Sequence, residues 1–317
     1  MTRMHRAATG DVCMLTRKTV KRRSLRSRFI SWFLKRKFKP KLMADDFDPI
    51  RFRKTVERDM GQGGPADGVS IREVEQPGLK GEWHEPADAD PARCILYCHG
   101  GGYLFGTAAS YRPFTTRLAK QSGARVFSLD YSRAPEAPFP AAADDAMAAW
   151  HYLLETFKPE QIYLAGDSAG GGLVLSLLHQ IQQAGLAMPA KAVLLSPYAD
   201  LKCTGTSLAS NDRRCAMFSG DAIRRAAAGY LNGADPEDPR ASPLYADYTG
   251  FPPLRIYLSD TEVLRDDGIR VAERAADAGV SVELHTWRGQ PHVWPLFVPV
   301  MPEANTTLQE MADFCRV

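Results

Sequence analysis

The chain alternates between short apolar segments and helical stretches, and this alternation restricts its fold more than any other feature of the sequence. Repeated strand-then-helix units form a mostly parallel sheet with helices on both of its faces. We therefore predict an α/β fold. The predicted strands lie near residues 94–98, 125–130, 161–165, 191–196, 254–259 and 281–286. The predicted helices lie near residues 111–121, 141–156, 170–184, 220–231, 266–278 and 303–315.

Two further segments complete a predicted sheet of eight strands. Residues 71–75 and 79–84 flank a turn at 76–78 and predict an antiparallel hairpin at the edge of the sheet. A chain of 317 residues is within the range of one α/β domain that carries insertions. We assign residues 61–317 to this domain. Within it, residues 200–250 break the alternation and are predicted to form a cap insertion over the site.

Residues 1–60 are predicted to be a basic N-terminal cap segment. Residues 1–41 contain fourteen Lys or Arg and one acidic residue, so they carry +13 although the whole chain carries only +3. Phe29, Trp32 and Phe33 stand among these cations, and a basic helix with aromatic residues can lie on an anionic membrane or bind nucleic acid. We favour a cap that buries its aromatics on the rest of the protein. We therefore expect no nucleic-acid partner and leave a weak contact with a membrane surface open.

The composition also bears on membrane insertion, secretion and metal binding. No apolar run reaches the roughly eighteen residues of a membrane-spanning helix, and no apolar region precedes a cleavage site typical of secretion. The six cysteines have neither metal-ligand spacing nor the density of a disulfide scaffold. We therefore predict a cytoplasmic protein with reduced thiols and no metal site.

A serine stands between a predicted strand and a predicted helix in the motif Gly166-Asp167-Ser168-Ala169-Gly170. A strand-to-helix turn of this kind holds the hydroxyl clear of the backbone and tolerates only small residues around it. The free N–H groups of the following helix can stabilise a negative oxygen. Ser168 is therefore the predicted nucleophile.

A second motif, His99-Gly100-Gly101-Gly102-Tyr103, also follows a predicted strand. A backbone without side chains can present successive N–H groups to an oxyanion. The glycines precede a tyrosine and not a phosphate-binding lysine, so the motif does not indicate a nucleotide site. We expect the chemistry to need no cofactor.

A serine nucleophile needs a base, and the base needs a carboxylate to orient it. In sheets of this type the order along the chain is serine, acid, histidine. His292 lies in a loop after the last strand, whereas His285 lies inside that strand, so His292 is the better base. Asp260 and Glu262 both follow the strand at 254–259, and the residues alone do not decide between them.

Four motifs of this sequence occur together in one enzyme family. They are His99-Gly100-Gly101-Gly102, Asp130-Tyr131-Ser132-Arg133-Ala134-Pro135-Glu136, Gly166-Asp167-Ser168-Ala169-Gly170-Gly171 and Pro291-His292. The chain resembles the hormone-sensitive-lipase family of α/β-hydrolase esterases, the bacterial group IV type, over roughly residues 65–315. The resemblance implies a carboxylic ester hydrolase with an α/β-hydrolase fold, a helical cap and a catalytic domain at 61–317. It places Glu262 at the acid position, with Asp260 as the alternative. The sequence departs from the family pattern at Arg133, where the family normally has leucine.

The resemblance also implies a role for each residue of the site. Ser168 attacks the ester, His292 takes the serine proton, and Glu262 orients His292, so that an acyl-enzyme intermediate forms. The predicted oxyanion hole is built from the backbone of four small residues, the first of which mainly shapes the loop. These residues are Gly100, Gly101, Gly102 and Ala169.

The predicted substrate is a small ester with a short- to medium-chain acyl group. Tyr103, Phe218 and Trp294 are predicted to line its pocket. Some proteins of this fold are receptors that lost the catalytic histidine, but His292 is present here. Homodimers formed through edge strands are common in the family, so both a monomer and a homodimer stay open, as do the physiological ester and the stereoselectivity.

Overall fold

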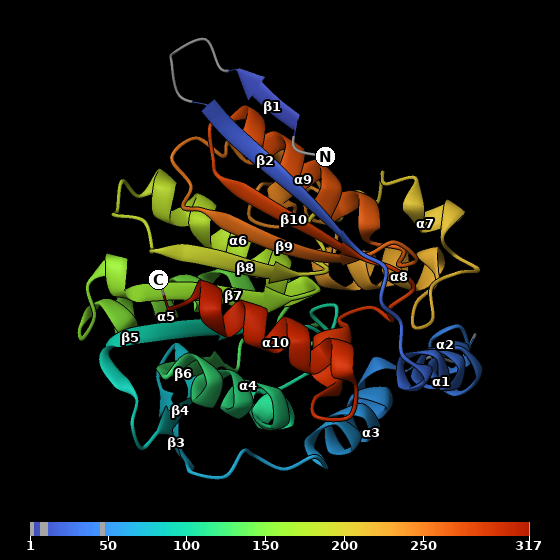
Figure 1. Ribbon diagram of the computed structural model, residues 1–317, viewed down its shortest axis with the longest axis horizontal. Coiled ribbons are helices and arrows are strands. Elements are labelled where there is room, and N and C mark those ends of the chain that lie inside the picture. Colours follow the sequence, from blue (N-terminus) through green and yellow to red (C-terminus); the bar gives the residue numbers. More distant parts are fainter. Residues whose placement is uncertain (1–2, 7–11, 45–47, 317) are drawn as a thin grey trace.

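One mixed sheet of ten strands forms the centre of the protein (Figure 1). The computed structural model describes residues 3–6, 12–44 and 48–316. The strands are β1 (Arg3–Arg6), β2 (Val12–Val20), β3 (Val69–Gln76), β4 (Leu79–Pro86), β5 (Asp90–Cys98), β6 (Ala124–Leu129), β7 (Ile162–Asp167), β8 (Lys191–Leu195), β9 (Leu254–Ser259) and β10 (Val282–Trp287). Their order is β1-β2-β10-β9-β8-β7-β5-β6-β4-β3. The strands from β2 to β6 in this order are parallel, and β1, β4 and β3 are antiparallel to their neighbours.

The α/β prediction and the hairpin of β3 and β4 are confirmed, but the predicted count of eight strands is wrong. The two additional strands come from the N-terminal segment. β2 pairs in parallel with β10 over residues 15–20, where Leu15 is buried and Arg17 forms an exposed ion pair with Glu273 at 2.7 Å. Residues 12–20 therefore belong to the sheet and not to a cap, because pairing with β10 satisfies their backbone while their charges stay in water.

Helices cover both faces of the sheet, as predicted. They are α1 (Leu25–Phe33), α2 (Lys39–Leu42), α3 (Pro49–Gly61), α4 (Ala108–Ser122), α5 (Ala141–Leu154), α6 (Ala169–Gln183), α7 (Ser207–Ser210), α8 (Gly220–Leu231), α9 (Arg265–Asp277) and α10 (Pro302–Phe314). α4 and α10 lie together on one face, where Ile95 of β5 packs with Leu118 and Leu308. α5, α6 and α9 contribute to the core on the other face, which contains Leu96 of β5 and Leu173 of α6. Successive side chains of β5 thus pack alternately into two separate cores, one on each face of the sheet.

Two segments far apart in the sequence meet near the carboxyl ends of the parallel strands. One contains α1, α2 and α3, and the other is the stretch 200–250 with α7 and α8 (Figure 1). The Phe38 ring, in the π-helical turn Leu34–Phe38, contacts Phe52 of α3 and Phe218 of the second segment, at centroid distances of 5.7 and 6.3 Å. Within the described part of the chain, no helix combines the length and apolar character that crossing a membrane requires.

Candidate active site

Ser168 lies at the sharp turn between β7 and α6. Its backbone φ is 52° and its ψ is −119°, a conformation that L-residues rarely adopt and that recurs at functional sites. A Cβ atom on Gly170 would collide with the carbonyl oxygens of Cys98 and His99, and one on Gly166 would collide with the backbone of Gly170. The two glycines of the motif are therefore required because α6 starts in direct contact with the end of β5.

The glycine motif after β5 forms a tight loop beside Ser168. Gly101 has a φ of 123° and Gly102 a φ of 62°, and a Cβ on Gly101 would collide with the carbonyl oxygen of Phe105. The Gly100 N–H donates to Asp167 Oδ1 at 2.9 Å. Because this N–H already binds a carboxylate, it is not a donor of the oxyanion hole, and Gly100 shapes the loop, which is the role that the resemblance implied for it.

His99 holds the same loop from inside the protein. Its Nδ1 donates to the carbonyl oxygen of Gly100 at 2.7 Å, and its ring stacks on Tyr131 with centroids 4.1 Å apart. Burial lowers the pKa of His99 to about 3, so the ring is neutral at pH 7. His99 is thus a structural residue of the loop.

Asp167 connects the glycine loop to the serine turn, a role that the sequence did not reveal. Its carboxylate accepts hydrogen bonds from Tyr97 Oη at 2.7 Å, from the Gly100 N–H at 2.9 Å and from Tyr111 Oη at 3.1 Å. Burial raises the pKa of Asp167 to about 6, although these three donors favour the charged form. The one signal in the sequence was a carboxylate directly before the nucleophile.

Asp167→Asn should weaken the pH dependence of stability. The folded-state pKa of about 6 exceeds the ordinary 3.8, so the folded protein binds the proton more tightly and its free energy of unfolding falls between about pH 4 and pH 7. This contribution is at most about 3 kcal/mol, and the variant lacks it. Urea unfolding of both proteins at pH 4 and pH 7 measures the difference. Burial also raises the pKa of Asp267 to about 7. Asp267 is present in both proteins, so its contribution to the pH dependence is the same in each and drops out of the difference between them. An unchanged pH dependence in the variant would contradict the assignment.

His292 is paired with Glu262 and not with Asp260. Its Nδ1 donates to Glu262 Oε2 at 2.6 Å, and both residues are 1% exposed. Glu262 Oε1 accepts the N–H of Ser259 at 2.7 Å, which fixes the carboxylate. Asp260 instead accepts the N–H of Gly289 at 2.7 Å. The Nε2 atom of His292 is buried and has no hydrogen-bond partner among the described residues.

Ser168 and His292 lie on the wall of one cavity of about 1080 Å³. Much of this wall is apolar and comes from three parts of the chain: the N-terminal helices, the stretch 200–250 and the loop after β10. The apolar side chains include Leu34, Phe38, Phe52, Val56, Met217, Phe218, Val293, Leu296 and Phe297. The cavity can therefore hold an apolar ligand with its reactive group at the serine.

Of the three aromatic residues predicted to bind substrate, only Phe218 lines the cavity. Its ring meets His292 edge-on with centroids 5.2 Å apart. Tyr103 stacks on Tyr230 at 3.8 Å in the core, and the Trp294 Nε1–H donates to Thr307 Oγ1 at 3.0 Å in the opposite core. The predictions for Tyr103 and Trp294 are wrong because these large rings are fully buried between secondary-structure elements, where their polar atoms or faces find partners.

The helix α3 is fastened to the segment that follows the glycine loop. Arg53 donates from Nε to the carbonyl oxygen of Leu104 at 2.8 Å and forms two hydrogen bonds with Glu136, of 2.8 and 2.9 Å. Sequence reasoning missed Arg53, because nothing in the chain marks its partners in advance.

A second pair completes this attachment. Glu57 Oε1 accepts the N–H of Gly106 at 2.9 Å and pairs with Arg133 Nη1 at 2.8 Å. Arg133 is the residue that departs from the leucine of the resembled family, so this departure signalled a polar contact. α3 thereby holds the backbone at both Leu104 and Gly106.

No group of three or more His, Cys, Asp or Glu side chains comes together as a metal site within residues 3–6, 12–44 and 48–316.

The chain is similar to known proteins in both sequence and structure. A family profile described as the alpha/beta hydrolase fold matches residues 95–296. An acetyl-hydrolase of Streptomyces hygroscopicus is 42% identical over 236 residues, which are 74% of this chain and 79% of that protein. An esterase of Acinetobacter venetianus is 35% identical over 248 residues, 78% of this chain and 82% of that protein. A crystal structure of an esterase from the bacterial hormone-sensitive lipase family matches with a TM-score of 0.87 and 34% identity, covering 93% of this chain and 98% of that chain.

Proposed function

The chain belongs to the α/β-hydrolase family, within the bacterial hormone-sensitive-lipase group, and is a carboxylesterase; from this premise we propose that Ser168, His292 and Glu262 are its catalytic triad. The observation that carries the proposal is the 2.6 Å hydrogen bond between His292 Nδ1 and Glu262. This bond keeps the proton on Nδ1 and leaves Nε2 able to accept one. Ser168 lies on the same cavity wall and is the donor that this geometry favours.

The reaction follows in two halves. As Ser168 Oγ bonds to the ester carbonyl carbon, His292 Nε2 takes the serine proton and then gives it to the departing alkoxide, which leaves as an alcohol. Water repeats the attack on the acyl-enzyme, again through His292, and releases the acid together with free serine. Glu262 stabilises the imidazolium that forms in each half without taking its proton.

We assign the stabilisation of the tetrahedral oxyanion to the backbone N–H groups of Gly101, Gly102 and Ala169. Ala169 begins α6, so its N–H belongs to the positive end of the helix dipole. Gly101 lines the cavity beside Ser168. Because Asp167 and α3 hold both ends of the glycine loop, these donors need little reorganisation when charge develops.

The proposed substrates are esters with short- to medium-chain acyl groups. The relative named acetyl-hydrolase supports a short acyl group. The cavity of about 1080 Å³ is at the upper end of the usual range for small-molecule sites, and its apolar wall leaves room for a larger apolar alcohol or a longer acyl chain.

Labelling by a fluorophosphonate tests this assignment directly. The purified protein should hydrolyse p-nitrophenyl acetate and lose this activity as one fluorophosphonate group is attached per chain, with loss of fluoride. Peptide mass spectrometry should find the phosphonyl group on Ser168, and excess ester should slow the labelling. Stoichiometric labelling of another serine, or ester binding without turnover, as in a receptor of this fold, would contradict the proposal.

A further inference from the structure

The helix α1 faces the protein with its small polar residues and faces the solvent with its large apolar ones. Ser27 and Ser31 are buried, and Ser27 Oγ donates to Gln290 Oε1 at 2.7 Å. Leu25, Phe29 and Trp32, spaced by four and three residues, are 79%, 64% and 52% exposed. This orientation is the reverse of that of an ordinary surface helix.

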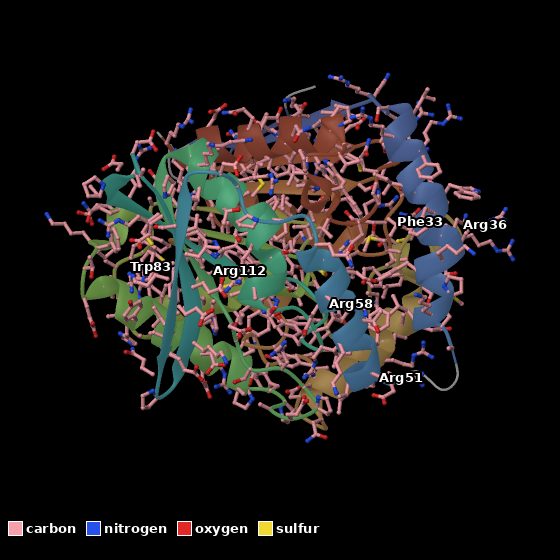
Figure 2. All side chains as sticks on the ribbon, turned by 90° about the horizontal axis from the view of Figure 1, so that it is seen from below. Phe33, Arg36, Arg51, Arg58, Trp83 and Arg112 are labelled. Atoms are coloured by element: carbon pink, nitrogen blue, oxygen red, sulfur yellow. The ribbon has the colours of Figure 1, made fainter. Side chains whose placement is uncertain are left out.

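The sequence favoured burial of these aromatics on the protein, and the structure contradicts that expectation. Phe33 is also 48% exposed, and Figure 2 shows Phe33 and Arg36 on the outer helix at the edge of the molecule. The physical reason is that serines give the closer contact between α1 and the loop after β10. Other large exposed apolar side chains lie nearby in the chain or beside the cavity: Met43, Ile50 and Val300.

The surroundings of this apolar face are strongly cationic. Residues 21–41 contain ten Lys or Arg and no acidic residue. The guanidinium of Arg36 lies 5.8 Å from the centre of the Trp32 ring. A second cavity, of about 440 Å³, lies beside the start of α1 and collects five cations around one carboxylate. Its charged residues are Lys21, Arg23, Arg28, Arg214, Arg288 and Asp260.

The apolar face is continuous with the active-site cavity. Phe33 and Val300 are both exposed and line that cavity, together with Lys37 and Lys41. A ligand that enters between these residues passes from the exposed face to the wall that holds Ser168.

We propose that this face, formed by Leu25, Phe29, Trp32 and the exposed cations of residues 21–41, which are all of their Lys and Arg except the buried Lys39, docks the enzyme on an anionic lipid surface. Apolar side chains that enter the lipid boundary, surrounded by cations that meet anionic headgroups, are the features of an interfacial helix. Nucleic acid would use the cations but not the exposed Leu25, and a second copy would bring two basic faces together. Docking would bring the opening of the active-site cavity against esters dissolved in the lipid. The delivery of such esters to Ser168 rests on the proposed function, but the docking itself does not.

Vesicle sedimentation tests the docking separately from catalysis. Ser168→Ala protein should sediment with vesicles of phosphatidylcholine and phosphatidylglycerol (3:1) and not with pure phosphatidylcholine, and 0.5 M NaCl should reduce the bound fraction several-fold. Leu25→Gln/Phe29→Gln/Trp32→Gln should lower the vesicle partition coefficient by about tenfold or more. The same triple change in the active enzyme should leave p-nitrophenyl acetate turnover within about twofold, because none of the three residues lines the cavity.

A matched pair of charge variants makes the test specific. Lys21→Gln/Arg28→Gln should also weaken binding, whereas Arg72→Gln/Lys80→Gln, which removes two exposed cations on the opposite edge of the sheet, should not. Absence of binding to the anionic vesicles, or equal losses from both charge pairs, would overturn the proposal. The proposal would also fail if the parent protein did not bind the vesicles and instead bound DNA or self-associated through Leu25, Phe29 and Trp32.

Discussion

Ser168→Ala is expected to lower kcat for p-nitrophenyl acetate by about 10⁴-fold or more. The change removes the atom that forms the acyl-enzyme, while the oxyanion donors and the cavity stay in place. Both residues have a Cβ, so the strained backbone at a φ of 52° is equally accessible to the variant and its fold should persist. Stopped-flow and steady-state release of p-nitrophenol measure kcat, and thermal unfolding verifies the fold.

A suitable control for this experiment lies in the same helix. Ser176 is a buried serine of α6 that does not line the active-site cavity. Ser176→Ala should therefore change kcat by less than about threefold. If Ser168→Ala retained more than a tenth of the wild-type kcat, Ser168 would not be the nucleophile.

Glu262→Gln is expected to lower kcat by about 10³- to 10⁴-fold, with a much smaller change in KM. The amide fills nearly the same volume, but its NH₂ group next to His292 Nδ1 favours the tautomer with the proton on Nε2. That tautomer cannot accept the proton of Ser168. The measurement is kcat and KM for p-nitrophenyl acetate between pH 6 and pH 9.

The matched variant is Asp260→Asn, which alters the other carboxylate after β9. Its oxygen can still accept the N–H of Gly289, so kcat should stay within about threefold of the wild-type value. The opposite pattern, with turnover lost in Asp260→Asn and retained in Glu262→Gln, would make Asp260 the acid and refute the triad proposed above.

The sequence predicted those parts of the fold in which local periodicity and tertiary environment agree. The stretch predicted as a helix at 220–231 is α8 (Gly220–Leu231), and the strand predicted at 254–259 is β9 (Leu254–Ser259). In α8 the apolar residues recur every three to four positions along one buried face, whereas β9 is a short apolar run that is buried on both of its faces. The turn at Ser168 was predictable for a different reason: its glycines are needed by sterics and leave little choice of residue.

The remaining features depend on contacts between distant parts of the chain. Tyr103 and Trp294 could line a pocket or fill a core, since both environments are apolar and residue type does not separate them. Arg53 and Glu57 look like ordinary surface charges of α3 until their partners at 104–106 and 133–136 are known.

The pairing of β2 with β10 also determines the order in which the protein can be assembled. Leu15 faces Val282, which is 267 positions later in the chain. During synthesis, β2 can therefore pair only with β1 until β10, near the other end of this sequence, has been made. Its cations keep copies of this segment apart in the interval. β2 is thus made long before β10 and is among the last strands to take its final place in the sheet.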